Sequence, residues 1–366
     1  MKRQLLMTPG PTPVPEEIAK KMAEPIIHHR TPEYREIFKA LSEDLKLVFK
    51  TGNDCLVFAS SGTGAMEASL VNILSPGDKA VVIRGGKFGE RYYEICEAFG
   101  VSAIPIDIEW GTSPDPQVIK DALNKNRGVK AVFTQLVETS TASVYDIKAI
   151  GGLVKGTDAV LVVDAISGLG ADDLETDSWG VDIAVGGSQK ALMLPPGLSF
   201  CSVSQKAWSM VKGSKLPKYY YDFSKYKKSK EKNDTPFTPA ITLAIGLKKA
   251  LEHIKSAGID NILKECETMA QTVRGAAKDL GLRVFSKAPS NALTALEMTE
   301  GRDSSLLVKA IKERGIIVAD GQAHLKGRII RIAHMGGITR QDVERTIRVL
   351  KEALDELKNK NARCKA

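Results

Sequence analysis

The residues of this chain whose types and spacing could do chemistry begin with a lysine and an aspartate. Lys190 ends the run Gly-Gly-Ser-Gln-Lys at 186–190, which follows the mostly apolar stretch 181–185 and precedes an apolar, proline-rich turn. An amine in such surroundings is partly desolvated, and desolvation favours its neutral, nucleophilic form. Asp164 ends the apolar run 159–163, so we expect it at the carboxyl end of a buried strand, where ligands bind in open α/β sheets.

A neutral amine and a carboxylate in this setting suit chemistry on a carbonyl cofactor. Lysine amines form Schiff bases with carbonyl compounds, pyridoxal phosphate (PLP) included. A carboxylate against the pyridine nitrogen of PLP keeps the ring protonated and electron-withdrawing. Each residue also has an ordinary interpretation, because the chain holds 52 lysines and arginines, and an aspartate after a strand is often a helix cap. The PLP hypothesis therefore depends on further motifs.

A turn rich in glycine and hydroxyl side chains occupies residues 60–68, which read Ser-Ser-Gly-Thr-Gly-Ala-Met-Glu-Ala and follow a short predicted strand at 56–59. Free backbone N–H groups at a helix N-terminus, together with small residues and hydroxyls, make a phosphate cradle. The turn matches neither the Walker A nor the dinucleotide-binding pattern. Many such turns bind no phosphate, so Ser61, Gly62 and Thr63 are candidates only in combination with the lysine.

Two further candidates follow predicted strands. Phe88 lies in a glycine turn after the strand 79–84 and could stack on a flat cofactor ring, although most aromatic side chains only fill cores. Thr139 lies in the polar segment after the strand 129–134, and a hydroxyl there can hydrogen-bond the phenolic oxygen of the cofactor. Both residues lie at the carboxyl end of a strand, as Asp164 does, which favours one shared site.

An arginine in the last predicted strand could hold a substrate. The strand 328–332 carries Arg328 and Arg331, and side-chain alternation puts one of them on the inward face. A guanidinium holds a carboxylate by two parallel hydrogen bonds. The alternative is a surface arginine that pairs with a neighbouring acid, and the residues alone leave both open.

The positive charge of the chain, formally +8, is concentrated in one stretch. Residues 206–232 hold nine lysines against Asp222 and Glu231, and they include the aromatic run 219–221. Basic and aromatic residues together can bind RNA, but the chain carries no nucleic-acid-binding motif. We favour a solvated loop near the mouth of the active site, where it would attract anionic substrates.

The remaining composition indicates an ordinary cytoplasmic protein. No apolar stretch approaches the roughly 20 residues that span a bilayer, and the N-terminus lacks a hydrophobic signal region. The five cysteines are scattered, without a CxxC pair or metal-ligand spacing, so we expect buried thiols in a reducing compartment. We expect no bound metal, no membrane and no nucleic-acid partner.

The order of predicted elements indicates an α/β fold. Up to residue 204, strands alternate with helices, which predicts a parallel sheet that ends in an antiparallel or edge strand at 198–204. Further along, helices are segregated from a few strands, which predicts a smaller α+β domain. We expect a large domain over 16–255 and a small one formed by 1–15 and 256–366. The principal predicted helices cover 15–22, 33–49, 115–124, 241–254, 259–280, 304–314 and 339–359.

Taken together, these motifs resemble the class V aminotransferases, in the alanine/serine–glyoxylate (serine–pyruvate) group. The resemblance extends over essentially the whole chain. Its most specific part is Ser-Gln-Lys at 188–190 followed by Pro-Pro-Gly at 195–197, at this distance from Asp164. The other matching segments are 9–12, 61–68, 138–141, 162–165 and the surroundings of Arg331.

The resemblance implies a type I PLP fold and a homodimer whose active sites lie at the subunit interface. Lys190 would form the Schiff base and carry the proton, Asp164 would face the pyridinium, and Arg331 would clamp the substrate α-carboxylate. The other cofactor contacts would come from Ser61, Gly62, Thr63, Phe88, Thr139 and Gln189, with Thr235 or Thr238 reaching over from the other subunit.

Three positions depart from the family pattern. Phe88 stands where many relatives have a tryptophan, Thr63 where some have a histidine, and Ala142 where a glycine is usual. None of the three removes a chemical group that the chemistry needs.

The implied reaction is a ping-pong transamination. A small L-amino acid, alanine or serine, gives its amino group to PLP, and glyoxylate or pyruvate then takes it up. The alternatives are an aspartate or phosphonate transaminase, a desulfurase or lyase on the same scaffold, or a hydrogenase-associated subunit. A desulfurase needs a reactive cysteine on a mobile loop, whereas Cys266 and Cys364 lie in a predicted helix or tail.

Overall fold

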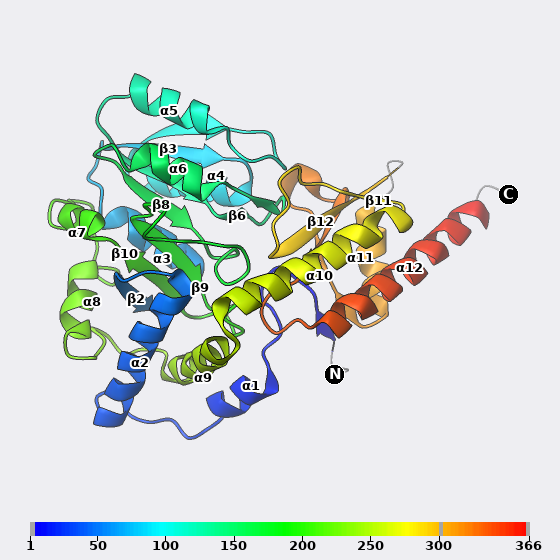
Figure 1. Cartoon of the computed structure of the whole chain (residues 1–366), viewed down its shortest axis with the longest axis horizontal. Helices are drawn as coiled ribbons and strands as arrows, with labels where there is room; N and C mark the ends of the chain where they lie inside the picture. The colour runs from blue at the N-terminus through cyan, green and yellow to red at the C-terminus, as the bar shows by residue number, and fades with distance from the viewer. Residues whose placement is uncertain (1–3, 300–302, 364–366) are drawn as a thin grey trace.

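Two β-sheets, each flanked by helices, make up the computed structural model, which describes residues 4–299 and 303–363 (Figure 1). The larger sheet has seven strands and the smaller has four. The long helices α10 (Ile259–Asp279) and α12 (Arg340–Arg363) lie beside the smaller sheet, away from the seven strands.

The seven-stranded sheet is mostly parallel, as the alternation of elements predicted. Neighbouring strands from β9 to β4 are parallel, whereas β10 pairs antiparallel with both β9 and β2. The predicted strand at 198–204 is therefore antiparallel but not an edge strand, because β2 covers its outer side. The strands follow the order β2 (Asp54–Phe58), β10 (Ser199–Val203), β9 (Ile183–Gly187), β8 (Val160–Asp164), β5 (Val129–Gln135), β3 (Lys79–Arg84) and β4 (Ser102–Asp107).

Side-chain alternation along these strands produces an apolar layer on each face of the sheet. In β8, Leu161 and Val163 belong to one buried cluster, and Val160 and Val162 belong to the other. All five residues of β8 are buried, as expected for a parallel strand that is covered on both sides. Asp164 has the parity of Val160 and Val162 and so faces the second layer.

Different helices cover the two faces. The first layer is covered by α1 (Glu16–Met22), α2 (Pro32–Phe49), α5 (Pro116–Lys125), α6 (Ile147–Val154) and α9 (Ile241–Ala257). The second is covered by α3 (Gly62–Val71), α4 (Lys87–Ala98), α7 (Gln205–Val211) and α8 (Phe223–Lys230). The sequence analysis did not predict α4, α6, α7 or α8.

The prediction of a solvated loop over 206–232 is wrong. The stretch folds into α7 and α8, whose apolar side chains Trp208, Phe223 and Tyr226 are buried. The lysines crowd the exposed face, and Asp222 accepts a 3.0 Å hydrogen bond from the Ser224 N–H at the start of α8. The density of lysines hid a short amphipathic pattern in which one residue in every three or four is aromatic or aliphatic.

The smaller sheet is antiparallel. Its strands follow the order β11 (Leu282–Val284), β12 (Leu293–Met298), β15 (Ile329–Ala333) and β14 (Ala319–Asp320). Helices α10, α12 and α11 (Ser304–Glu313) pack against it. The N-terminal strand β1 (Leu5–Leu6) lies nearby and pairs in parallel with β13 (Ile316–Ile317).

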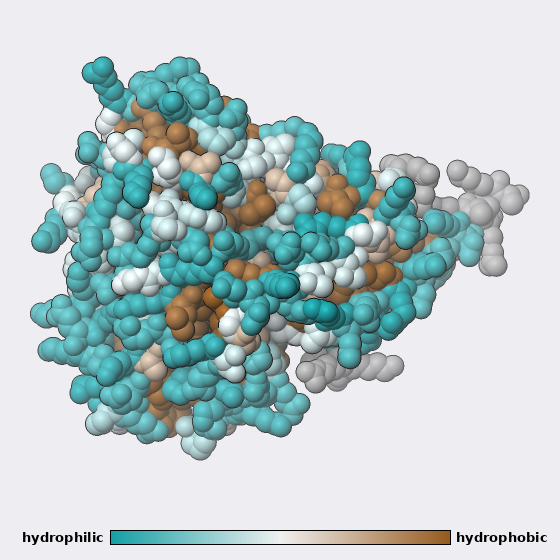
Figure 2. All heavy atoms as spheres, viewed as in Figure 1, coloured by the Kyte–Doolittle hydropathy of each residue, from teal (hydrophilic) through white to brown (hydrophobic). Residues whose placement is uncertain are grey.

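We propose the same division into domains as the sequence suggested, with 16–255 as one unit and 1–15 plus 256–366 as the other. A third apolar cluster supports it, because Met7 packs there with residues drawn only from 269–354. The face of the molecule seen in Figure 2 is mostly hydrophilic, with apolar residues in narrow patches. Among residues 4–299 and 303–363, no helix is both long and apolar enough to cross a membrane.

Candidate active site

Lys190 lies in the turn that follows β9, and the turn is held by Ser188. The Ser188 hydroxyl donates to the Pro195 carbonyl at 2.8 Å and accepts from the Leu198 N–H at 3.1 Å. The Lys190 side chain is buried, and its Nζ donates to the carbonyl of Pro9. The N-terminal segment thus lies directly on the lysine.

Gly10 explains how the N-terminal segment approaches so closely. A Cβ atom added at Gly10 would lie 2.6 Å from both Cε and Nζ of Lys190, and the φ of Gly10 is +143°, which L side chains rarely adopt. Two further bonds fix the segment, since Thr12 Oγ1 donates to the Lys190 carbonyl at 2.8 Å and Thr12 N–H donates to the Gln189 carbonyl at 3.1 Å. Only a residue without a side chain fits against the amine here.

Burial shifts the pKa values of Lys190 and Asp164 towards each other. Desolvation lowers the pKa of Lys190 to about 8, against the opposing attraction of the Asp164 carboxylate. Desolvation likewise raises the pKa of Asp164 to about 7, although the N–H of Ile166 donates to its carboxylate at 2.9 Å. A substantial fraction of the amine is therefore neutral near physiological pH, as the apolar sequence around Lys190 suggested.

A cavity of about 230 Å³ opens beside Lys190. It brings together eight of the residues predicted for the site, which are Ser61, Gly62, Thr63, Phe88, Thr139, Asp164, Gln189 and Lys190. The sequence analysis missed six others that line it, namely Gly10, Pro11, Arg91, Ile166, Ser167 and Pro196. The arrangement places an amine, a carboxylate, an aromatic ring and a glycine-rich helix start around one small volume.

The turn predicted to cradle phosphate forms the first residues of α3. Ser61 is the N-cap but makes no side-chain capping bond, and Thr63 Oγ1 accepts a 3.2 Å hydrogen bond from Arg91. Gly62 is required for close packing, since an added Cβ would lie 2.4 Å from Cδ1 of Ile166. The side-chain oxygen of Gln189 is buried without a hydrogen-bond partner.

These features fit PLP. A helix start with uncapped N–H groups suits the phosphate, the unpartnered Gln189 amide can be satisfied by a bound polar group, and a partly neutral amine lies within the same cavity as a carboxylate. The donor set is also chemically appropriate, because a lysine must meet the aldehyde and an acid the ring nitrogen.

Phe88 and Thr139 are tied together by the buried carboxylate of Glu138. One oxygen of Glu138 accepts from the backbone N–H groups of Phe88 and Gly89 at 3.0 and 3.1 Å, and the other accepts from the N–H and hydroxyl of Ser140 at 3.1 and 2.5 Å. Burial raises the pKa of Glu138, and these four donors oppose the rise. Glu138 therefore fixes the start of α4, which carries Phe88, against the segment that carries Thr139.

Thr139 and Ala142 complete this segment. The Thr139 hydroxyl lies 2.6 Å from the hydroxyl of Ser167. Ala142, where a glycine is usual in the family, is buried and has a φ of +59°, a left-handed conformation that is costly for a residue with a Cβ. The turn thus keeps a conformation suited to glycine.

Arg331 faces inward, and Arg328 is exposed. The Arg331 guanidinium donates to the Asp320 carbonyl at 2.8 and 3.0 Å, to the Thr139 carbonyl at 3.1 Å and to the Gln322 side chain at 3.3 Å. Burial lowers its pKa to about 10, partly offset by Glu138 and Asp320. Arg331 is not among the residues that line the cavity, but it holds Thr139, which is.

Neither Thr235 nor Thr238 faces the cavity of its own chain. Thr235 Oγ1 donates to the Phe237 carbonyl at 2.8 Å, and Arg30 donates to the Thr235 carbonyl at 2.8 Å. Thr238 is exposed. Their predicted approach to the phosphate of another subunit stays a prediction.

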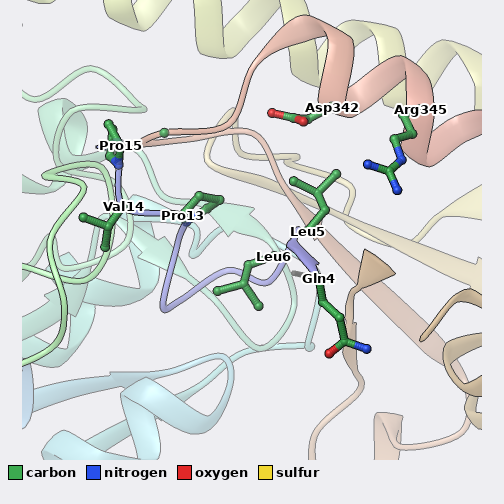
Figure 3. Close-up of a pocket in the computed structure, with 9 residues that line it drawn as sticks. Gln4, Leu5, Leu6, Pro13, Val14, Pro15, Asp342 and Arg345 are labelled. Carbon is green, nitrogen blue, oxygen red and sulfur yellow. The ribbon is translucent and has the colours of Figure 1, made fainter. Parts of the chain in front are cut away.

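A larger cavity of about 510 Å³ lies between the N-terminal segment and the start of α12 (Figure 3). Its charged groups are Asp342 and Arg345, both on α12, and it contains none of the predicted site residues. Asp342 is engaged in capping α12, where it accepts from the Thr339 N–H and hydroxyl at 3.0 and 2.7 Å. The chemistry of this chain therefore centres on the smaller cavity.

The comparisons with known proteins agree with this site. The family model described as aminotransferase class-V matches residues 5–348. A relative named soluble hydrogenase, small subunit, from Synechococcus sp. (strain PCC 6716) is 40% identical over 97% of this chain and 94% of its own. L-aspartate–glyoxylate aminotransferase of Paracoccus denitrificans is 33% identical, over 91% of this chain and 87% of its own. Serine–glyoxylate aminotransferase of Methylorubrum extorquens is also 33% identical, over 92% and 87% respectively.

Solved structures are similar over nearly the whole chain. An aspartate aminotransferase of subgroup IV from Thermus thermophilus superposes with a TM-score of 0.90 at 30% identity, covering 96% of this chain and 99% of its own. An alanine–glyoxylate aminotransferase from Nostoc sp. superposes with a TM-score of 0.93 at 25% identity, covering 97% and 96%.

Proposed function

Because the chain belongs to the class-V aminotransferases, we propose that it transfers the amino group of a small L-amino acid, alanine or serine, to glyoxylate or pyruvate. The family and the α/β fold predicted from the sequence are thereby confirmed, and the family implies PLP as the cofactor. The observation that carries the proposal is the buried Lys190 amine, which shares one cavity with the Asp164 carboxylate and the start of α3.

The cofactor, when bound, supplies the electron sink that stabilises a carbanion at the substrate Cα, and it stores the amino group between the two half-reactions. Everything else in the reaction falls to side chains of this chain. Their tasks are to hold the cofactor, to orient the substrate and to move one proton.

Lys190 is the residue that moves the proton. Its pKa, lowered to about 8 by burial, allows the amine to take a proton from the substrate Cα and to give it up again near neutral pH. The Pro9 carbonyl accepts a hydrogen bond from Nζ and so fixes the position of the free amine. Prolines 9 and 11, with Gly10 between them, also keep water from the rear of the amine.

Asp164 is the partner proposed for the ring nitrogen. A cationic ring next to the carboxylate would lower the Asp164 pKa from its raised value of about 7, because an opposite charge at contact favours the ionised form. The ionised carboxylate in turn keeps the ring nitrogen protonated. Phe88, held by Glu138, would stack on the ring, and Thr139, held by Ser167 and Arg331, would reach its phenolic oxygen.

Arg331 is proposed to bind the substrate α-carboxylate. Its guanidinium is already held in place through the Asp320 carbonyl. The Gln322 side chain occupies one N–H group at 3.3 Å, the longest of these contacts, and is the partner that a carboxylate can replace most readily. Glyoxylate, pyruvate, alanine and serine all carry this carboxylate, so one arginine serves both half-reactions.

The substrate class follows from the small volume of the cavity and from the relatives. A cavity of about 230 Å³ that must also hold the cofactor leaves room for a small side chain. The relatives named serine–glyoxylate and L-aspartate–glyoxylate aminotransferase support glyoxylate as acceptor. We further propose a cytoplasmic homodimer in which Thr235 or Thr238 of one subunit completes the phosphate site of the other.

The alternatives raised by the sequence are less well supported. A desulfurase requires a reactive thiol, but the cysteines within the described residues are all buried, and burial raises the pKa of Cys266 to about 12. The likeness to solved cysteine desulfurases is at 14% to 15% identity and reflects the fold alone. The hydrogenase-subunit name of one relative suggests no use for the cavity around Lys190.

Product formation with labelled substrate tests the proposed function. The purified protein with added PLP is incubated with ¹⁵N-labelled L-alanine, L-serine or L-aspartate and with glyoxylate, and labelled glycine is measured by mass spectrometry. We expect labelled glycine from alanine or serine, and none from the Lys190→Ala variant. Labelled glycine from aspartate alone would replace the proposed donor class, and no glycine from any donor would refute the proposal.

A further inference from the structure

Arg91 is the one cavity-lining residue with a guanidinium, and the sequence analysis assigned it no role. It lies on α4, three residues after Phe88, so the two side chains share one face of the helix. The guanidinium carbon lies 4.8 Å from the centroid of the Phe88 ring, and Nη1 donates to Thr63 Oγ1 at 3.2 Å. Arg91 thus bridges the stacking ring and the turn at the start of α3.

Arg91 has no carboxylate partner among residues 4–299 and 303–363. In contrast, Arg84 nearby is paired with Asp107 at 2.8 and 2.9 Å. The charge of Arg91 nevertheless reaches the centre of the site, because it lowers the pKa values of both Asp164 and Lys190. A half-buried, unpaired guanidinium beside a cavity is suited to meet an anion that enters it.

The predicted phosphate contacts lack a positive charge. Ser61, Gly62, Thr63 and Gln189 are neutral, and the N-terminus of α3 contributes only about half an elementary charge. The cofactor phosphate carries roughly two negative charges at neutral pH. A cation next to these residues would balance part of that charge, and Arg91 is next to Thr63.

The hydrogen bond between Arg91 and Thr63 also determines what Thr63 can do. Because Thr63 Oγ1 accepts from the guanidinium, its own O–H is left to donate. A hydroxyl that accepts from a cation is a stronger donor to an anion, since hydrogen bonds in a chain polarise one another.

We propose that Arg91 is a positioning residue for the cofactor phosphate, which orients the Thr63 hydroxyl towards the phosphate and supplies the positive charge that the neutral turn lacks. The inference rests on the proposed function only in placing PLP in this cavity. A role limited to supporting Phe88 is the competing explanation, because the same guanidinium packs on that ring.

The two explanations differ in what they predict for pyridoxal, which has the ring but lacks the phosphate. The full-length protein, stripped of cofactor, is titrated with PLP and with pyridoxal, and binding is followed by quenching of its three tryptophans. The variants are Arg91→Met and Arg91→Lys. The matched control is Arg84→Met, since Arg84 lies 4.4 Å over the ring of Tyr93 but outside this cavity.

We expect Arg91→Met to weaken PLP binding by about tenfold to a hundredfold, as for the loss of a hydrogen bond to a charged group, with pyridoxal binding changed less than about twofold on the same scale. Arg91→Lys should recover part of the loss, and Arg84→Met should change neither affinity. Equal weakening of both ligands by Arg91→Met would overturn the proposal in favour of the support of Phe88. An unchanged PLP affinity would overturn it outright.

Inorganic phosphate provides a second measurement that needs neither the ring nor turnover. Phosphate should raise the melting temperature of the stripped wild-type protein and of Arg84→Met more than that of Arg91→Met. An equal rise in all three would contradict the proposal. Both measurements are independent of transaminase activity, so failure of the proposed function would leave this inference separately testable.

Discussion

Replacing Gly10 with alanine tests whether the N-terminal segment forms part of the active site. The new Cβ would lie 2.6 Å from Nζ and Cε of Lys190 and 2.8 Å from Cδ, distances at which either the lysine or the segment must move. Alanine also rarely adopts the φ of +143° found at Gly10. Backbone strain costs about 1–3 kcal/mol, and overpacking a filled site costs about 1–3 kcal/mol more.

The two contributions can be separated with a matched control. Gly100 also has a positive φ, +66°, but an added Cβ there meets no atom within 4 Å. Gly100→Ala should therefore show strain alone, about 1–2 kcal/mol, and should leave the cofactor site untouched. Gly10→Ala should be more destabilising and should also displace the Lys190 amine.

The assay is chemical denaturation of each variant, combined with its visible absorption after PLP is added. We expect Gly10→Ala to lose about 2–6 kcal/mol of unfolding free energy, as the sum of the two terms above, and to take up less cofactor than Gly100→Ala. A Gly10→Ala variant that matches Gly100→Ala in both stability and cofactor uptake would refute the reasoning, because the segment would then not press on Lys190.

Three further predictions concern the groups around the cavity. Glu138→Gln leaves only one oxygen to accept four hydrogen bonds, so it should lower the unfolding free energy by about 1–3 kcal/mol and weaken PLP binding; melting and cofactor uptake equal to wild type would contradict this. Arg331→Lys keeps the charge but loses the planar fork, so KM for both substrates should rise about tenfold or more with a smaller change in kcat, and steady-state kinetics with unchanged KM would exclude the assigned clamp. In cofactor-free protein, the folded state holds a proton on Asp164 that the unfolded state lacks between pH 3.8 and about 7, so stability should fall as pH rises through that window. Between about 8 and 10.5 the unfolded state holds a proton on Lys190 that the folded state lacks, so stability should rise with pH there. Denaturation across pH should show the first slope vanish in Asp164→Asn and the second in Lys190→Met, and slopes that persist in these variants would contradict the assignment.

The sequence was most informative where short motifs coincide with strand ends. Asp164 and Lys190 each follow a run of apolar residues that must be buried in a parallel sheet, and the carboxyl ends of such strands meet at one edge. Ser61 to Thr63 were found from glycine and hydroxyl content at a strand-to-helix turn. These features are local, so composition and spacing were sufficient to find them.

The features that the sequence analysis missed depend on contacts between distant residues. Gly10 was quoted only as part of a family motif, and nothing local shows that its carbonyl neighbour receives the Lys190 amine. Arg91 would have been found if α4 had been predicted, because it then lies on the same helix face as Phe88. The lysine-rich stretch was misjudged because charge density outweighed a few buried aromatic residues such as Trp208.

The central claim is that one amine, Lys190, supports a two-step transfer in which the protein keeps the amino group between substrates. The most direct test is to add L-alanine or L-serine, without any 2-oxo acid, to stoichiometric PLP-loaded protein and to record its absorption spectrum. We predict that the visible band of the bound cofactor disappears, that one equivalent of 2-oxo acid is released per site, and that glyoxylate restores the band. A band that stays unchanged with either donor, or an amino transfer that proceeds only when donor and acceptor are both present, would contradict the account.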